Sequence, residues 1–376
     1  MADDMFSIGI EEEYLLVNAE TLELADTPDE MIDDCRGIIG DQVSPEFLRC
    51  QIEIGTKVCA NVTEARAELL HLRRTISDTA AKHGLRPIAA ACHPFAEWAK
   101  QHRSPKDRYD QLHRDLGGVS DRMLICGMHV HVGIPGEDDR IDLMAQLSYF
   151  LPHLLALSTS SPFWQGRETG LASYRLGVFD NLPRTGLPAR FGSWSEYRRM
   201  VDLLVKTGSL KDGTFIWWDL RPSDRFPTLE TRICDACTQV DHTVALAAAI
   251  QATLRMLWRL KQSNQRWRIY DNVMIQENRW RARRYGINEG LVDFGRGEIV
   301  PMAELVREWT GLIAEDAEAL GSTEALGVLH DIIANGTSAD RQRRIREEAL
   351  AGGASSEDAM RAVAADLADQ FLPDDA

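Results

Sequence analysis

The sequence predicts an α+β protein, and two observations support that prediction. Five segments in the first two-thirds of the chain alternate apolar with polar side chains, which is the period of a β-strand. From about Asp241 onward, the apolar residues recur every three or four positions, which is the period of a helix. The sequence has no internal repeat, low-complexity tract or Gly/Ser linker. We therefore expect residues 1–376 to form one domain, with residues from about 300 to 376 as a helical extension.

The five predicted strands share one design, in which one face is apolar and the other carries charged residues, tryptophan and glycine. In the first strand Ile8 and Ile10 lie on one face and Glu11 and Glu13 on the other, while Glu12 falls on the mainly apolar side. The strands are predicted at Phe6–Val17, Gln51–Thr56, Cys126–Ile134, Thr214–Arg221 and Thr228–Cys234. The polar faces of the later strands carry Glu53, His129, His131, Trp217, Asp219, Arg221, Glu230 and Arg232, and no lysine.

Four helices are predicted from capping residues and apolar stripes. Thr63 is expected to cap a helix that ends at Gly84, and Asp241 is expected to cap another. Pro301 suits the first position of a third helix. The last helix has an apolar stripe of Met360, Val363, Leu367 and Phe371. We interpret these stripes as core or subunit contacts, and the C-terminal ones leave room for a homodimer.

The stretch from Ser158 to Phe191 differs from the rest because turn-forming glycines, prolines and an asparagine crowd into it. It also carries four arginines, Arg167, Arg175, Arg184 and Arg190. Long ordered loops inside a compact domain are usually functional. We expect this stretch to fold over an anionic ligand.

The polar faces point to metal and nucleotide binding if the five strands belong to one sheet. Four carboxylates gathered on one surface repel one another unless they are protonated or bridged by cations. Carboxylate oxygens with an occasional imidazole suit Mg²⁺ or Mn²⁺, and nucleotide phosphates can complete the coordination. Glycines on the same face leave room for a ligand to approach the sheet.

Taken singly, the same residues also have purely structural interpretations. Glu11 or Glu13 alone could lie on the surface of the protein. His129 could be a hydrogen-bonded structural histidine, and this interpretation suits His131 better still. Arg221 could simply pair with a nearby carboxylate. Only the five strands together favour a functional surface.

The composition of the chain indicates which binding partners and which cellular compartment to expect. A net charge of −16 argues against a nucleic-acid-binding protein, which needs a basic surface. The sequence has no signal peptide and no apolar stretch long enough to span a membrane, so we expect a cytoplasmic protein. Its seven cysteines suit a reducing compartment. Cys234 and Cys237 form a C-x-x-C pattern without a second ligand pair, and we interpret them as packing residues.

Four motifs now point to a known family. The segments Gly9–Tyr14, Gln51–Thr56, Cys126–Gly133 and Glu230–Asp235 resemble the signature strands of bacterial carboxylate–amine ligases. These enzymes are often called type 2 glutamate–cysteine ligases, within the glutamine synthetase-like superfamily. Ser160–Phe163 and the stretch from Ser173 to Gly186 are similar to loops of plant-type glutamate–cysteine ligases. The resemblance runs in colinear order from about residue 6 to beyond residue 285.

The resemblance implies a curved antiparallel sheet with helices on its outer face and an active site on its concave face, so that the domain would be a catalytic one. It implies ATP and Mg²⁺ (or Mn²⁺) as cofactors. The matching positions make Glu11, Glu13, Glu53, His129 and Glu230 metal ligands, with Glu46 as a further candidate. They also make Arg232 and Arg221 catalytic candidates, and place Arg175, Arg184 and Arg232 near the nucleotide phosphates or the substrate.

The implied reaction forms an amide through an acyl phosphate, and its small-molecule partners are a carboxylate and an amine. The carboxylate attacks the γ-phosphorus of ATP, and the amine then displaces phosphate. Glutamate and cysteine are the default substrates by family name, since the metal-binding face does not identify the acid or the amine. No Walker A motif occurs, so a P-loop does not hold the nucleotide. Two alternatives stay open: an amide hydrolase with zinc on His129 and His131, and a non-catalytic nucleotide-binding protein.

Overall fold

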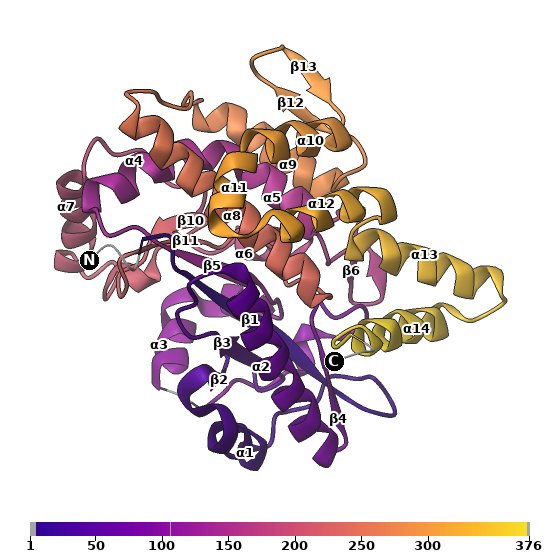
Figure 1. The fold of residues 1–376 in the computed structure, drawn as a ribbon. Coiled ribbons are helices and arrows are strands. Elements are labelled where there is room, and N and C mark those ends of the chain that lie inside the picture. Colours follow the sequence, from indigo (N-terminus) through magenta and orange to yellow (C-terminus); the bar gives the residue numbers. More distant parts are fainter. Residues whose placement is uncertain (1–4, 106, 374–376) are drawn as a thin grey trace.

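The computed structural model describes residues 5–105 and 107–373, and seven of its strands form one antiparallel sheet (Figure 1). Six of them follow the order β10 (Leu220–Pro222), β11 (Thr228–Thr231), β5 (Met128–Gly133), β1 (Ile8–Asn18), β3 (Gln51–Gly55) and β2 (Val43–Pro45). The seventh, β4 (Leu85–Ile88), pairs with the C-terminal half of β1. Four of the five predicted polar strands and the end of the fifth therefore share one sheet, which was the condition for their charged faces to meet.

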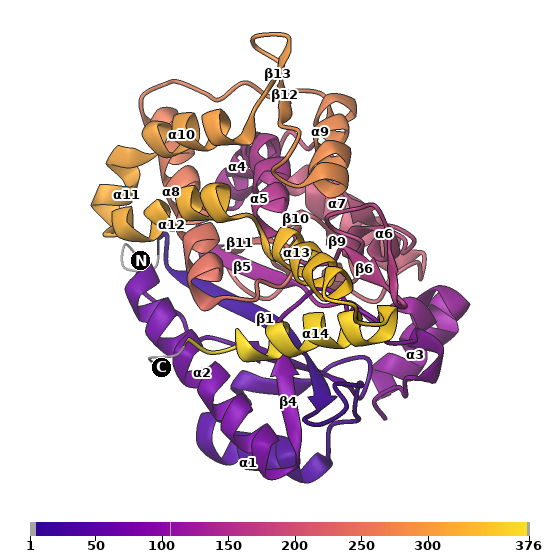
Figure 2. The same ribbon diagram turned by 90° about the vertical axis from the view of Figure 1, so that its right-hand side faces the viewer.

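Three pairs of short strands lie outside this sheet. They are β6 (Phe163–Trp164) with β7 (Arg167–Glu168), β8 (Thr185–Gly186) with β9 (Trp217–Trp218), and β12 (Leu291–Asp293) with β13 (Glu298–Val300). The β12–β13 hairpin projects from the body at the top of Figures 1 and 2. The stretch from Ser158 to Phe191 is mostly loop, as its composition predicted.

The helices of the described residues surround the sheet. They are α1 (Asp29–Ile39), α2 (Val62–Lys82), α3 (Asp107–Leu116), α4 (Glu137–Leu147), α5 (Leu151–Ser158), α6 (Arg175–Phe179), α7 (Trp194–Lys206), α8 (Val240–Gln262), α9 (Asn272–Tyr285), α10 (Met302–Leu312), α11 (Ala314–Leu320), α12 (Thr323–Asn335), α13 (Ser338–Ala351) and α14 (Ser356–Asp369). The chain after about Asp241 is mainly helical, as predicted, but the strands β12 and β13 interrupt it, which the helical pattern did not predict. From α10 onward the described residues form helices alone. None of these helices combines the length and apolar character needed to cross a bilayer.

The apolar face of the sheet packs against α2 and α8. Ile8 and Ile10 of β1 are almost fully buried in one core with Leu72 of α2 and Ile250 of α8. Helix α8 is rich in alanine, and the alanines from Ala245 to Ala252 are fully buried in the same core. The opposite face of β1 is thereby left for the charged residues.

Glu12 lies on the buried side of β1, as its position in the alternation predicted. Its carboxylate accepts two hydrogen bonds from Arg73, at 2.7 and 2.9 Å, and one from Thr243. Tyr14 also donates to it. A buried charge is tolerated only when it is paired and hydrogen-bonded, so this carboxylate belongs to the core and not to the charged face.

Several predicted element boundaries were wrong. The segment Thr214–Arg221 is not one strand, since Trp217 belongs to β9, which pairs with β8 outside the main sheet. Asn61, and not Thr63, caps α2, because its side chain accepts from the backbone N–H of Glu64. Helix α8 begins before Asp241, which falls in its first turn.

The apolar stripe of the last helix packs inside the chain itself. Met360, Val363 and Leu367 are buried in one cluster with Leu15 of β1 and Ile88 of β4, and Phe371 contacts Tyr14 with the two rings edge to face. Helices α13 and α14 lie side by side across the view of Figure 2. Because these side chains are already covered, they no longer support a homodimer.

Candidate active site

A cavity of about 390 Å³ lies on the charged face of the sheet. The strands β1, β3, β5, β10 and β11, with the residue that follows β11, supply much of its charged lining: Glu11, Glu13, Glu53, His129, His131, Arg221, Glu230 and Arg232. Outside these strands the cavity is lined by Ser44, Glu46, Arg175, Thr214, Ser223, Asp224 and Arg225, with an aromatic wall of Phe47, Tyr109, Phe179, Phe215, Trp217 and Phe226. The fold therefore brings the charged side chains of the predicted strands together in one cavity.

Strand register explains which of these side chains become neighbours. Glu13 stands directly opposite Glu53 across the β1–β3 pair. Glu11 stands opposite His129 on β5, and His131 stands opposite Glu230 on β11. Residues directly opposite one another on one face of an antiparallel pair have their Cβ atoms only about 5 Å apart, so each of these pairs is in contact range.

Glu13, Glu46 and Glu53 form the first of two carboxylate clusters, with one oxygen of each lying within 4.8 Å of the others. Burial and the neighbouring Glu46 charge raise the pKa of Glu13 to about 7. Burial and the charges of Glu46, Glu11 and Glu13 raise the pKa of Glu53 well above its ordinary value. The three carboxylates therefore repel one another when no cation lies between them.

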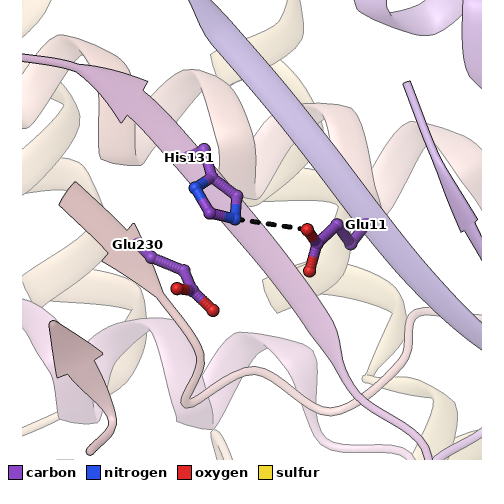
Figure 3. Close-up of side chains that lie close together, drawn as sticks. All are labelled: Glu11, His131 and Glu230. Atoms are coloured by element: carbon purple, nitrogen blue, oxygen red, sulfur yellow. Dashed lines mark ion pairs between the residues drawn. The ribbon is translucent and has the colours of Figure 1, made fainter. Parts of the chain in front are cut away.

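The second cluster consists of Glu11, His131 and Glu230, again with one ligand atom each within 4.8 Å (Figure 3). His131 Nε2 lies 3.4 Å from a carboxylate oxygen of Glu11. Burial opposes the charged form of Glu11, but hydrogen bonds from His129 and His131 hold its pKa well below the usual range. Burial opposes the charged form of Glu230 as well, but the charges of Arg232 and Arg221 lower its pKa.

His129 lies between the two clusters. Its Nδ1 is 3.1 Å from Glu11, and its Nε2 is 4.0 Å from an oxygen of Glu13. Burial, together with the charge of Arg232, lowers the pKa of His129 to about 4, so the ring is neutral near neutral pH and able to act as a ligand. His129 Nε2 is buried without a hydrogen-bond partner among the described residues.

Two of the predicted arginines flank Glu230. Arg221 donates to both carboxylate oxygens of Glu230, at 2.7 and 3.0 Å, and also to the backbone carbonyl oxygens of Thr214 and Ile216. Arg232 donates to Glu230 through Nη1, while its Nε is buried with no hydrogen-bond partner in the described part of the chain. Arg221 therefore uses its donors in hydrogen bonds within the protein. Arg232, in contrast, keeps Nε as a donor without an acceptor among the described residues.

The two loop arginines lie in different places. Arg175 lines the cavity, is 2% exposed, and donates to the carbonyl oxygens of Ile233 and Arg232. Arg184 lies behind the wall of the cavity, where its Nε donates to the carbonyl oxygen of Phe215 and its guanidinium stacks over Trp217. Contact of Arg184 with a nucleotide stays a prediction.

Gly127 makes room for the Arg175 guanidinium, which leads to a testable prediction. A Cβ atom at position 127 would lie 2.8 Å from Cζ of Arg175, well inside van der Waals contact. We expect Gly127→Ala to displace this guanidinium. If Arg175 binds a nucleotide phosphate, as the sequence resemblance implies, the variant should weaken ATP binding about tenfold or more, because one hydrogen bond to a charged group contributes about 1.5–3 kcal/mol. Calorimetric titration with Mg–ATP measures the effect. Gly55→Ala is the matched control, since a Cβ there meets Glu11 Cγ only at 3.9 Å; equal losses in both variants would contradict the prediction.

The two clusters fit divalent cations. Two ligands on opposite sides of Mg²⁺ lie about 4.2 Å apart, and the ligand atoms of each cluster all lie within 4.8 Å of one another. The unpaired His129 Nε2 is a further ligand atom. Oxygen-rich donor sets of this kind suit Mg²⁺ or Mn²⁺ better than zinc.

Sequence reasoning assigned His131 to a structural role and named Glu46 only as a further candidate. His131 completes the second cluster because it faces Glu230 across β5 and β11, a pairing that no sequence pattern reveals. Glu46 follows the short β2, which packs beside β3 and brings this residue next to Glu53. The alternation on β5 was the available signal for His131, since it puts both histidines on one face.

Comparison with known proteins identifies the family. A sequence model of glutamate–cysteine ligase family 2 matches residues 7–365. Relatives from Jannaschia sp. and Paracoccus denitrificans, both named "Putative glutamate--cysteine ligase 2", are 58% and 57% identical over 99% and 98% of this chain and over 98% of each relative. The chain belongs to glutamate–cysteine ligase family 2. As a member of this family it is an ATP-dependent ligase, as the resemblance implied.

Solved structures share the fold of this family member at low sequence identity. The glutamate–cysteine ligase of Francisella tularensis in complex with AMP matches with a TM-score of 0.70 at 13% identity, over 98% of this chain and 89% of that chain. A bifunctional glutathione synthetase from Pasteurella multocida gives a TM-score of 0.70 at 15% identity, over 98% of this chain and 52% of that chain, so the chain spans about half its length. These matches confirm the predicted glutamine synthetase-like fold.

Proposed function

We propose that this ligase joins glutamate to cysteine with ATP, and that the reaction takes place in the cavity on the charged face of the sheet. The observation that carries the proposal is the meeting of two carboxylate clusters with buried arginines in one cavity. Such a surface suits a reaction between two anions, a carboxylate and a nucleotide triphosphate, because cations and guanidinium groups offset their repulsion. The names of the family and of its relatives support glutamate and cysteine as the pair.

The carboxylates and histidines would hold the metal ions. The proposed ligands of one ion are Glu13, Glu46 and Glu53. The proposed ligands of a second ion are Glu11, His131 and Glu230. His129 could complete either set, since it lies between them. Bound Mg²⁺ or Mn²⁺ would supply Lewis-acid polarisation and neutralisation of the ATP phosphates.

The arginines would bind and orient the phosphates. Arg232 has a buried Nε that finds no acceptor among the described residues, and this donor is our candidate for binding the phosphoryl group in transfer. Arg175 is the second candidate, since its guanidinium is held by backbone carbonyls at the edge of the same cavity. Arg221 is assigned a positioning role, because its contacts hold Glu230 and the Thr214–Ile216 segment.

The proposed chemistry has two steps. An oxygen of the substrate carboxylate attacks the γ-phosphorus of ATP, and ADP leaves. The amine nitrogen then attacks the acyl carbon of the resulting acyl phosphate, and phosphate leaves with the bonding electron pair. Buried donors such as Arg232 Nε would stabilise the negative charge that develops on the carbonyl oxygen in the second step.

Phosphate release from Mg–ATP tests the proposal. We expect release only when L-glutamate and L-cysteine are both present, and we expect EDTA to abolish it and added Mg²⁺ to restore it. Mass spectrometry of the product should give the mass of the dipeptide. Activity with other acid and amine pairs but not with this one would overturn the substrate assignment alone.

Zinc-dependent amide hydrolysis is not favoured, because both clusters consist mainly of carboxylate oxygens. Hydrolysis of the dipeptide without nucleotide would contradict our proposal. A cytoplasmic location is part of the same proposal, since all seven cysteines are unpaired and buried, which suits a reducing compartment.

A further inference from the structure

The segment Ser158–Ser161 precedes the loop that leads to Arg175, and it is held by parts of the chain that are far apart in sequence. Ser160 donates through Oγ to the carbonyl oxygen of Ala236. Its own carbonyl oxygen accepts from Gln342 of α13, at 2.8 Å. The C-terminal helices, to which no chemistry is assigned above, therefore reach the loop that carries the active-site arginine Arg175.

Asp235 is the centre of this arrangement. Its side chain is fully buried, and its two carboxylate oxygens accept three hydrogen bonds: from the backbone N–H of Ser160 at 3.0 Å, from Oγ of Ser161 at 2.8 Å and from Oγ of Ser173 at 2.8 Å. One carboxylate thus ties both ends of the loop between Ser160 and Ser173 to the segment that follows β11. Burying a carboxylate is costly unless its oxygens are hydrogen-bonded, and the three hydrogen bonds offset part of that cost here.

The same contacts continue to Arg175. Ser161 Oγ, which donates to Asp235, accepts from the backbone N–H of Arg175 at 3.2 Å. Gly127, which makes room for the Arg175 guanidinium, pairs with Asp235 in an isolated β-bridge. The backbone and the guanidinium of Arg175 are therefore both placed by groups attached to Asp235.

Helix α13 supports this centre from the side away from the cavity. Gln342 is 1% exposed and donates to the carbonyl oxygen of Ser160, whose N–H is bound by Asp235. Thr159 donates to Thr337, the residue that caps α13. The peptide units on both sides of Ser160 are thus held, one by Asp235 and the other by the C-terminal helix.

We propose that Asp235 is a positioning residue for Arg175, and that Gln342 links the C-terminal helices to the active site through it. The inference rests on the proposed role of Arg175 in binding nucleotide phosphate. Asp235 and Gln342 themselves contact no substrate, and they act by keeping the Ser160–Arg175 loop and its guanidinium in place. This gives the C-terminal helical segment a function in nucleotide binding.

A double-mutant cycle tests the inference. Its measured quantity is the affinity for Mg–ATP, which calorimetry gives without any acid or amine substrate present. We expect Arg175→Ala and Asp235→Asn each to weaken Mg–ATP binding about tenfold or more, and the double variant to bind no more weakly than Arg175→Ala alone. Gln342→Met should weaken binding in the same direction by a smaller factor. If the double variant loses affinity by the product of the two single factors, Asp235 acts independently of Arg175 and the inference is overturned.

Matched controls separate positioning from general damage to the fold. Asp316→Asn removes an equally buried carboxylate that pairs with Arg255 and Arg259, and Gln251→Met removes a buried glutamine that donates to the carbonyl oxygen of Phe6. Both should lower the denaturation midpoint and leave Mg–ATP affinity unchanged. If Arg175→Ala has no effect on affinity, the proposed role of Arg175 fails and the inference with it. If Arg175→Ala weakens binding while folded Asp235→Asn does not, the inference alone fails.

Discussion

Glu53→Gln is expected to abolish the activity and, without metal, to stabilise the protein. Glu53 lies in a cluster with Glu13 and Glu46. Burial raises the pKa of Glu53, and the charges of Glu46 and Glu13 raise it further. Glutamine keeps the shape of the side chain and is always neutral, so the folded variant avoids the cost of either charging or protonating a carboxyl group at this position. The same change removes a metal ligand, so phosphate release should fall by at least about a hundredfold, which corresponds to about 2.7 kcal/mol of transition-state stabilisation.

Thermal unfolding of the wild type and the variant, with and without Mg²⁺, measures both effects. In the wild type, Mg²⁺ at a hundred times its dissociation constant should add about 2.7 kcal/mol of stability. In Glu53→Gln this increase should be largely lost, although the metal-free variant starts at an equal or higher midpoint. Glu68→Gln is the control, because Glu68 pairs with Gln42 and Lys57 outside the cavity. A Mg²⁺ response as large in Glu53→Gln as in the control would contradict the assignment of Glu53 as a ligand.

Arg73→Met should produce the largest loss of stability of any change considered. Arg73 and Glu12 are fully buried, and Arg73 donates to both oxygens of the Glu12 carboxylate. Methionine would leave that carboxylate uncompensated in the core, at a cost of about 3–5 kcal/mol. Arg73 also donates to the carbonyl oxygens of Thr238, Cys237 and Phe371, so the variant should loosen the C-terminal end of the chain as well.

The double variant Glu12→Gln/Arg73→Met separates charge burial from loss of contacts. It removes both charges, and the glutamine carbonyl can still accept from Tyr14 and Thr243. We expect it to recover much of the stability lost in Arg73→Met, as read from the midpoint of urea denaturation. Folded fractions of both variants should keep their Mg–ATP affinity, since this pair lies on the face of β1 opposite to the cavity. A double variant less stable than Arg73→Met would rule out uncompensated charge as the cause.

The alternation of side chains along single strands was enough to predict the α+β class and most of the charged lining. It put Glu11 and Glu13 on one face of β1 and Glu12 on the other, and the structure has them so. This works because a strand has a strict period of two, so that sequence alone determines which side chains share a face. The resemblance to ligases then supplied the family, which the comparisons confirm.

Which of these side chains meet was decided by the tertiary structure. His131 joins Glu11 and Glu230 because β5 lies between β1 and β11, and Glu46 joins Glu53 because β2 packs beside β3. Arg184 lies outside the cavity lining, although its loop suggested the same role as that of Arg175. Period and composition specify the face of a strand, but strand order, register and loop path arise from contacts between residues far apart in the chain. The two clusters and the Asp235 centre are therefore properties of the packed fold, whereas the charged face is a property of the sequence.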